Sequence, residues 1–141
     1  MPLDLDTART IIANTRESGR ASGFQPLTVV VLDAGAHVVA VEREDGSSNK
    51  RFEIAFAKAN GALAFGIGSR ALMARAETFP SFVAGATSAI GGALIPVPGG
   101  VLVRDADGQI IGAVGISGDN SDNDEAAGIV GIEAAGLTAD P

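Results

Sequence analysis

The feature that most constrains this chain is the small size of the side chains in its closing third, IIGAVGISGDNSDNDEAAGIVG (110–131). An alternating apolar pattern over 109–117 predicts a strand, one face of which becomes small at Gly115 and Ser117. The helix predicted over 122–137 has glycine or alanine at positions 126, 127, 128, 131, 134 and 135. Glycine inside a helix costs about 1 kcal/mol relative to alanine. Close packing of helix on sheet, or a ligand or partner against the bare backbone, must offset this cost.

The composition extends this shortage of large side chains to the whole chain. Glycine occurs 19 times, aromatic residues make up 4%, and tryptophan and tyrosine are absent. The materials for an aromatic surface that stacks nucleic-acid bases are therefore missing, and a net charge of −7 would repel a phosphate polymer. The absence of cysteine excludes disulfides and cysteine-ligated metal sites. We expect no nucleic-acid partner and no metal site.

Length and hydropathy indicate one soluble domain over residues 1–141. The first residues lack a basic stretch followed by an apolar one, so no secretion signal is visible. No apolar run approaches the ~20 residues that span a bilayer. With no disulfides to form, the chain also suits a reducing compartment. We expect an acidic, cytoplasmic protein without a membrane partner.

The order of predicted elements gives the fold class. The turn Asp33–Ala36 joins two strands so tightly that they must be antiparallel, and the first of them is apolar on both faces, which is typical of a central strand. The segment 78–91 receives no assignment. The other predicted elements are helices over 7–20, 50–65, from 69, and over 122–137, strands over 27–33 and 37–45, and three short strands within 91–118. This order predicts an α+β fold, with a single five-stranded antiparallel sheet flanked by helices.

Four acidic residues crowd the start of the last helix, between positions 119 and 125. The glycines before them lack the G-x-G-x-x-G spacing of a dinucleotide site, and the acids would repel pyrophosphate. Acids complement the positive end of a helix dipole, and Ser121 with Asp124 predicts a capping box. Glu125 and Asp119 exceed what one cap needs. They could bind a cation or a protonated substrate, or serve in acid–base chemistry.

Four segments together resemble the GlcG/HbpS family, whose domain also ends PduO-type proteins. They are TVVVLDAGAHVVAVEREDG, EIAFAKANGALAFG, GGALIPVPGG and IIGAVGISGDNSDNDEAAG, and they follow the family's order over nearly the whole chain. The resemblance implies a profilin/PAS-like fold and dimers that assemble further, often into octamers. It also implies either haem binding or degradation, or a link to small-molecule catabolism. Two departures fall near the expected pocket, since Glu44 replaces a usually apolar residue and Asn60-Gly61 replaces bulkier ones.

His37 is the only histidine, and it follows a tight turn. It is either a structural turn residue or a ligand. If haem binds, the conventional axial ligands available are His37, Met73 and Met1. A threonine hydroxyl, such as that of Thr78 or Thr87, stays open as an unusual alternative.

The leading hypothesis is a homo-oligomeric domain that binds a small organic acid or haem; no other cofactor is indicated. The residues predicted to bind the ligand are His37, Phe52, Phe79, Gly99, Gly100, Gly115, Ser117, Gly118 and Asp119. The alternative is a cofactor-independent enzyme acting on a small organic acid or aldehyde. Glu125 or Asp124 would then transfer the proton, and Lys58, or Arg51, Arg70 or Arg75, would orient the substrate. A purely structural subunit is the third possibility.

Overall fold

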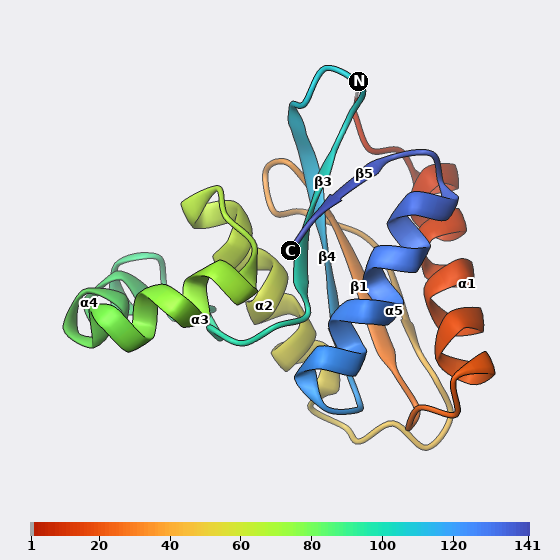
Figure 1. Cartoon of the computed structure of the whole chain (residues 1–141), viewed down its shortest axis with the longest axis horizontal. Helices are drawn as coiled ribbons and strands as arrows, with labels where there is room; N and C mark the ends of the chain where they lie inside the picture. The colour runs from red at the N-terminus through yellow and green to blue at the C-terminus, as the bar shows by residue number, and fades with distance from the viewer. Residues whose placement is uncertain (1) are drawn as a thin grey trace.

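A computed structural model describes residues 2–141, and it is built on one five-stranded sheet (Figure 1). The strand order is β2-β1-β4-β3-β5, and every neighbouring pair is antiparallel. The fold class predicted from the sequence is therefore confirmed. The strands are β1 Thr28–Asp33, β2 Val38–Arg43, β3 Gly100–Arg104, β4 Ile110–Ser117 and β5 Thr138–Asp140, and the helices are α1 Leu5–Ala21, α2 Arg51–Phe65, α3 Ser69–Thr78, α4 Pro80–Ala89 and α5 Ser121–Ala134.

Helices cover both faces of the sheet. On one face α1 and α5 pack together over β1, β3 and β4, as the right-hand side of Figure 1 shows. On the other face α2 packs through Ala55, Ala59 and Ala62. Alternate residues of β1 enter the two cores, with Val29 and Val31 on the first face and Val30 and Leu32 on the second. The prediction that this strand is central and covered on both sides is confirmed.

The fifth strand lies elsewhere in the chain than predicted. The segment 91–118 contains two strands, β3 and β4, whereas the third was expected before them. Residues 93–97 are not paired in the sheet, because Pro96 and Pro98 offer no N–H and local bonds such as Val97 N to Ile95 O (3.0 Å) bend the backbone. The missing strand is β5, which pairs with β3. Gly136 has a φ of 77° and turns the chain back from the end of α5 toward the sheet.

The segment that received no assignment forms most of a projecting arm. Pro80 occupies the first turn of α4, where its missing N–H is harmless, and α4 contacts α3. Figure 1 shows α3 and α4 extending to the left, away from the sheet. Among the helices described, none is long and apolar enough to cross a membrane.

The small residues of the closing third are used for close packing within the chain. A Cβ added at Gly115 would overlap the carbonyl oxygen of Ala55 in α2, and one at Gly131 would overlap Thr15 of α1. Glycine at these positions lets α2 approach β4, and lets α5 approach α1, almost to backbone contact. Close packing within the chain therefore explains why Gly115 and Gly131 are glycine.

Candidate functional site

A buried ion pair joins the two faces of the sheet at the C-terminal end of β4. The Nζ atom of Lys58 lies 3.2 Å from Oδ2 of Asp124 and donates to the carbonyl oxygen of Ile116 at 2.9 Å. Only 3% and 2% of the two side chains are exposed. Burial lowers the pKa of Lys58 and raises that of Asp124, since desolvation outweighs their mutual attraction. Of the two residues predicted to transfer a proton, Glu125 and Asp124, Asp124 is the one that the structure brings to Lys58.

The loop before α5 is organised by its own acids. Asn120 caps α5 by accepting from Asn123 N at 2.8 Å, so the predicted capping box of Ser121 and Asp124 is wrong. The carboxylate of Asp124 instead accepts from Asp119 N at 2.9 Å. Asp119 accepts from Gln25 N at 2.7 Å, and this backbone bond is the main cause of its lowered pKa. The extra acids therefore tie the loop to neighbouring segments.

Glu125 is half of a second ion pair. Its carboxylate, only 10% exposed, lies 3.0 Å from Nε of Arg70 in α3, and Arg70 also binds Asp122. A second candidate cation, Arg51, donates to Ser117 Oγ at 3.2 Å. Apart from Arg75, each group assigned to the enzyme alternative is thus held by a partner from this chain. The catalytic roles of Lys58, Asp124 and Glu125 stay predictions.

The predicted glycine contacts lie against the protein itself. Gly99 has a φ of 118°, and a Cβ there would come within 2.8 Å of Lys58 Nζ. A Cβ on Gly100 would overlap the Lys58 carbonyl, and one on Gly118 would overlap the Pro26 carbonyl. Ligand binding by these glycines and by Ser117 stays a prediction, and none of them lines the three cavities described below.

The two predicted aromatic contacts lie apart. Phe52, at the start of α2, is partly exposed and has its ring centroid 6.0 Å from that of Phe56. Phe79 joins α3 to α4 and is 60% exposed. Neither lines one of the described cavities, so their ligand contacts also remain predictions.

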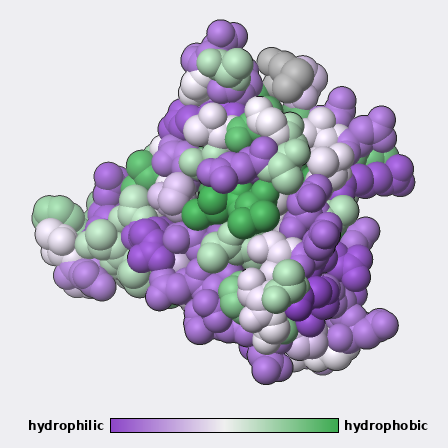
Figure 2. Space-filling view, turned by 45° about the vertical axis from the view of Figure 1, so that its right-hand side comes forward, coloured by the Kyte–Doolittle hydropathy of each residue, from purple (hydrophilic) through white to green (hydrophobic). Residues whose placement is uncertain are grey.

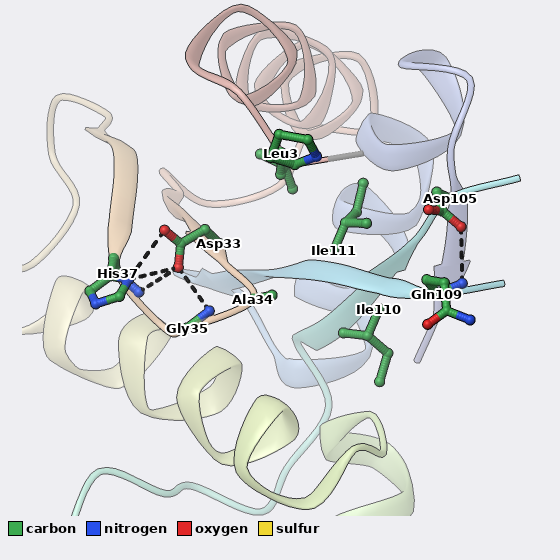
Figure 3. A pocket seen from close by; sticks show the side chains of 10 residues that line it. Leu3, Asp33, Ala34, Gly35, His37, Asp105, Gln109, Ile110 and Ile111 are labelled. Atoms are coloured by element: carbon green, nitrogen blue, oxygen red, sulfur yellow. Dashed lines mark hydrogen bonds and ion pairs between the residues drawn. The ribbon is translucent and has the colours of Figure 1, made fainter. Parts of the chain in front are cut away.

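The largest of these cavities, about 470 Å³, opens at the other end of the sheet (Figure 3). Three segments enclose it, the N-terminal residues, the β1–β2 turn and the β3–β4 turn. These segments meet because Asp33 at the end of β1 pairs with Gly112 near the start of β4. The lining residues are Pro2, Leu3, Asp33, Ala34, Gly35, His37, Asp105, Gln109, Ile110 and Ile111. His37 is the one predicted ligand-binding residue that lines this cavity.

Apolar and acidic groups occupy different parts of the cavity. Leu3, Ile110 and Ile111 supply apolar surface, with Asp33 and Asp105 toward opposite ends (Figure 3). Apart from His37, none of the described lining residues carries a basic side chain. The cavity therefore suits an apolar ligand body, and its acids oppose an anionic group placed between them.

His37 stands at one end of this cavity. Its Nδ1 atom lies 3.1 Å from Oδ1 of Asp33, and 79% of its side chain is exposed. Asp33 lies between the imidazole and the apolar residues, and the ring edge that carries Nε2 points away from the cavity (Figure 3). The backbone N–H of His37 is the main cause that lowers the pKa of Asp33, so its carboxylate is ionised at neutral pH.

The donor set narrows the possible haem ligands. Among the described residues, no group of three or more His, Cys, Asp or Glu side chains could hold a metal ion. Met73 is half-buried in α3, and Met1 lies outside the described residues. The hydroxyls of Thr78 and Thr87 donate to helix carbonyls at 3.2 and 2.7 Å. A haem iron needs one good donor, and the imidazole of His37 has the right chemistry, but its Nε2 atom must turn toward the cavity to reach an iron there.

Two smaller cavities are also described. One, of about 300 Å³, lies on the other side of the β1–β2 turn and includes Asn60, one of the family departures. The other, of about 210 Å³, is lined by Arg16, Arg20 and Glu44. Glu44, the other departure, is buried and accepts from Leu27 N at 2.7 Å while both arginines pair with it. It therefore ties α1 to the β1–β2 hairpin.

Sequence reasoning missed most of the large cavity. Leu3, Asp105, Gln109, Ile110 and Ile111 were assigned no role, because they belong to the N-terminal segment and to a different hairpin from His37. The cavity could have been found from the pairing of the first predicted strand with the strand over 109–117. That pairing brings the turns at 33–37 and 105–109 to one end of the sheet.

The chain is similar to a known protein family and to several solved structures. A family model described as "Haem degrading protein HbpS-like" matches residues 3–133. The solved PduOC–haem complex is similar with a TM-score of 0.87 at 22% identity, covering 100% of both chains. Klebsiella pneumoniae protein ORFY gives 0.83 at 20% identity, over 94% of this chain and 89% of its own. HbpS gives 0.79 at 24% identity, over 93% and 88%. A search of curated proteins gives no match.

Proposed function

Because the chain belongs to the HbpS-like family, we propose that it is a small-ligand-binding domain whose ligand is haem, bound at the cavity that ends at His37. The single observation that carries this proposal is the placement of the only histidine. It lies at the rim of the largest described cavity, with Nδ1 engaged by a carboxylate. The similar fold of the PduOC–haem complex supports the choice of haem.

Different residues of the cavity would contact different parts of the haem. Leu3, Ile110 and Ile111 would contact the apolar porphyrin. His37 would reach the iron only after its ring turns away from Asp33, because Nε2 points away from the cavity in the present orientation. Bound haem supplies an iron centre for ligand binding and electron transfer. Asp33 and Asp105 would repel the propionates, which must then face solvent. The same acids make a small organic acid a poorer ligand for this cavity.

Titration with hemin tests the proposal directly. The wild-type protein is expected to give a saturable Soret change with one haem per chain, and His37→Ala should lose the spectrum of an imidazole-ligated iron. Ile110→Ser should weaken binding, since it removes part of the apolar surface. Phe79→Ala is the matched control, because this exposed side chain belongs to the α3–α4 junction and does not line the cavity. Equal spectra and affinities for all four proteins would contradict the proposed site.

We also propose that the chain self-associates through the arm formed by α3 and α4. Phe79 and Phe82 are 60% and 57% exposed, and no residue of α4 is charged. Leaving such a helix in water is unfavourable. Figure 2 shows pale hydrophobic residues on this arm and a separate hydrophobic patch near the middle of the same view. The cytoplasmic location stays a prediction.

A further inference from the structure

The large cavity has acidic groups toward its ends and apolar side chains between them. Asp33 lies toward one end and Asp105 toward the other, while Leu3, Ile110 and Ile111 supply the apolar surface (Figure 3). Haem has no positively charged substituent to place beside either carboxylate, since its propionates are anionic. The charge of the lining therefore favours a different class of ligand from haem.

The carboxylate of Asp33 is charged and can accept from a ligand. Hydrogen bonds from backbone N–H groups, chiefly that of His37, lower the pKa of Asp33, so the side chain is ionised at neutral pH. These bonds go to Oδ1, whereas the contact described for Oδ2 is with Nδ1 of His37 at 3.3 Å. A carboxylate offers about four acceptor positions, and 37% of this side chain is exposed. Oδ2 therefore retains capacity for a bound donor.

Asp105 is oriented by a similar set of bonds in the β3–β4 turn. Its Oδ1 atom accepts from the backbone N–H of Asp107 at 3.0 Å and of Gln109 at 2.9 Å. These bonds hold the carboxylate at the wall of the cavity. Two different turns thus each present one oriented carboxylate to the same apolar space.

The sheet determines how far apart the two carboxylates lie. Asp33 pairs with Gly112 of β4, and β3, which ends just before Asp105, pairs with β4 on its other side. Two strand spacings therefore separate the two turns, about 10 Å across the sheet. One small ion cannot contact both carboxylates at this separation. A ligand that neutralises both needs two positive groups, and the apolar surface between them suits a hydrocarbon spacer.

We propose that this cavity binds a linear organic dication, an alkyl chain that carries an ammonium group at each end. One ammonium lies at Asp33 and the other at Asp105, and the hydrocarbon lies against Leu3, Ile110 and Ile111. The net charge of −7 adds a general attraction for cations. This inference goes beyond the haem proposal and does not depend on it, although the two ligands would occupy the same cavity.

The first test compares three ligands of one chain length on the haem-free wild-type protein. Octamethylenediamine carries two positive charges, octylamine carries one, and suberate carries two negative charges. Calorimetry at neutral pH and low ionic strength should show tightest binding for the diamine, weaker binding for octylamine and none for suberate. A 15N–1H spectrum should place the shifts caused by the diamine within residues 33–37 and 105–111. Absence of diamine binding, equal binding of suberate, or shifts confined to other residues would overturn the proposal.

The second test uses three variants that change the net charge equally. Asp33→Asn and Asp105→Asn each remove a carboxylate of the cavity but keep an oxygen for the turn. Asp107→Asn is the matched control, because its side chain belongs to the same turn as Asp105 and does not line the cavity. Each cavity variant should weaken diamine binding about fivefold, the control should leave it unchanged, and added salt should reduce the difference. A loss in Asp107→Asn equal to that in the cavity variants would overturn the proposal, because general attraction would then explain the binding.

The outcomes for the two ligands are separable. Hemin binding without diamine binding would overturn this inference and leave the proposed function in place, whereas diamine binding without hemin binding would refute haem as the ligand and support the dication. The comparison of the three ligands needs only the wild-type protein, so it decides the question even if Asp33→Asn disturbs the turn.

Discussion

Replacing Asp124 by asparagine is expected to be strongly destabilising. The variant leaves the ammonium of Lys58 buried beside a neutral amide, with the Ile116 carbonyl as its remaining described acceptor. Removal of one partner of a buried ion pair typically costs about 3–5 kcal/mol, because the other charge stays uncompensated. Since domains of this size unfold with about 5–15 kcal/mol, the change should remove a large part of the total stability.

Urea denaturation followed by circular dichroism measures this loss. Asp122→Asn is a close control, because it is the same substitution in the same helical turn, and the Asp122 side chain is 76% exposed. Its pairing with Arg70 is exposed to solvent, so losing it should cost little stability. The double variant Lys58→Met/Asp124→Leu should recover most of the loss, because a well-packed apolar pair often replaces a buried ion pair without cost. Equal, small effects of Asp122→Asn and Asp124→Asn would refute the reasoning.

Three further predictions concern stability and assembly. Burial lowers the pKa of Lys58 below its ordinary 10.5, so the folded state releases this proton first and the free energy of unfolding should rise as the pH approaches 10.5 from below. Urea titrations should show no such rise in Lys58→Met, and a fall in the wild type relative to this variant would contradict the sign. Gly115→Ala should lower the free energy of unfolding by at least about 1–3 kcal/mol, because the new Cβ overlaps the Ala55 carbonyl. Gly85 has open space around it, so Gly85→Ala should be neutral or stabilising by up to about 1 kcal/mol. Equal unfolding midpoints for the two variants would refute the packing explanation. Phe82→Ser should reduce the sedimentation coefficient if the arm joins subunits, and an unchanged value would exclude this residue from the contact.

The sheet could be predicted because its signals are local. The hairpin follows from a tight turn between two apolar runs, and the buried character of β1 follows from its lack of alternation. β5 escaped prediction because it has only three residues, and nothing in Thr138–Asp140 distinguishes a strand from a frayed terminus. Its pairing is imposed by β3, whose edge it covers. The tertiary environment, and not the local sequence, therefore determines that these residues form a strand.

The candidate site was harder to predict because its residues are distant in sequence. The acidic residues at the start of α5 were predicted to act on a ligand or substrate. In the structure they instead bind Lys58, Arg70 and backbone N–H groups of the same chain. Their number reflects how many donors converge there, which only the folded arrangement reveals. His37 was identified by its rarity, but its relation to Asp33 depends on a turn geometry with Ala36 at positive φ.

The central claim is that ligand binds at the β1–β2 and β3–β4 turns, and not at the glycine seam between β4, α2 and α5. Ferric haem broadens the NMR signals of nearby amides, so a 15N–1H spectrum recorded during hemin addition locates the iron. The account predicts selective broadening within residues 33–37 and 105–111. Broadening centred on residues 115–125, with the two turns unaffected, would contradict it.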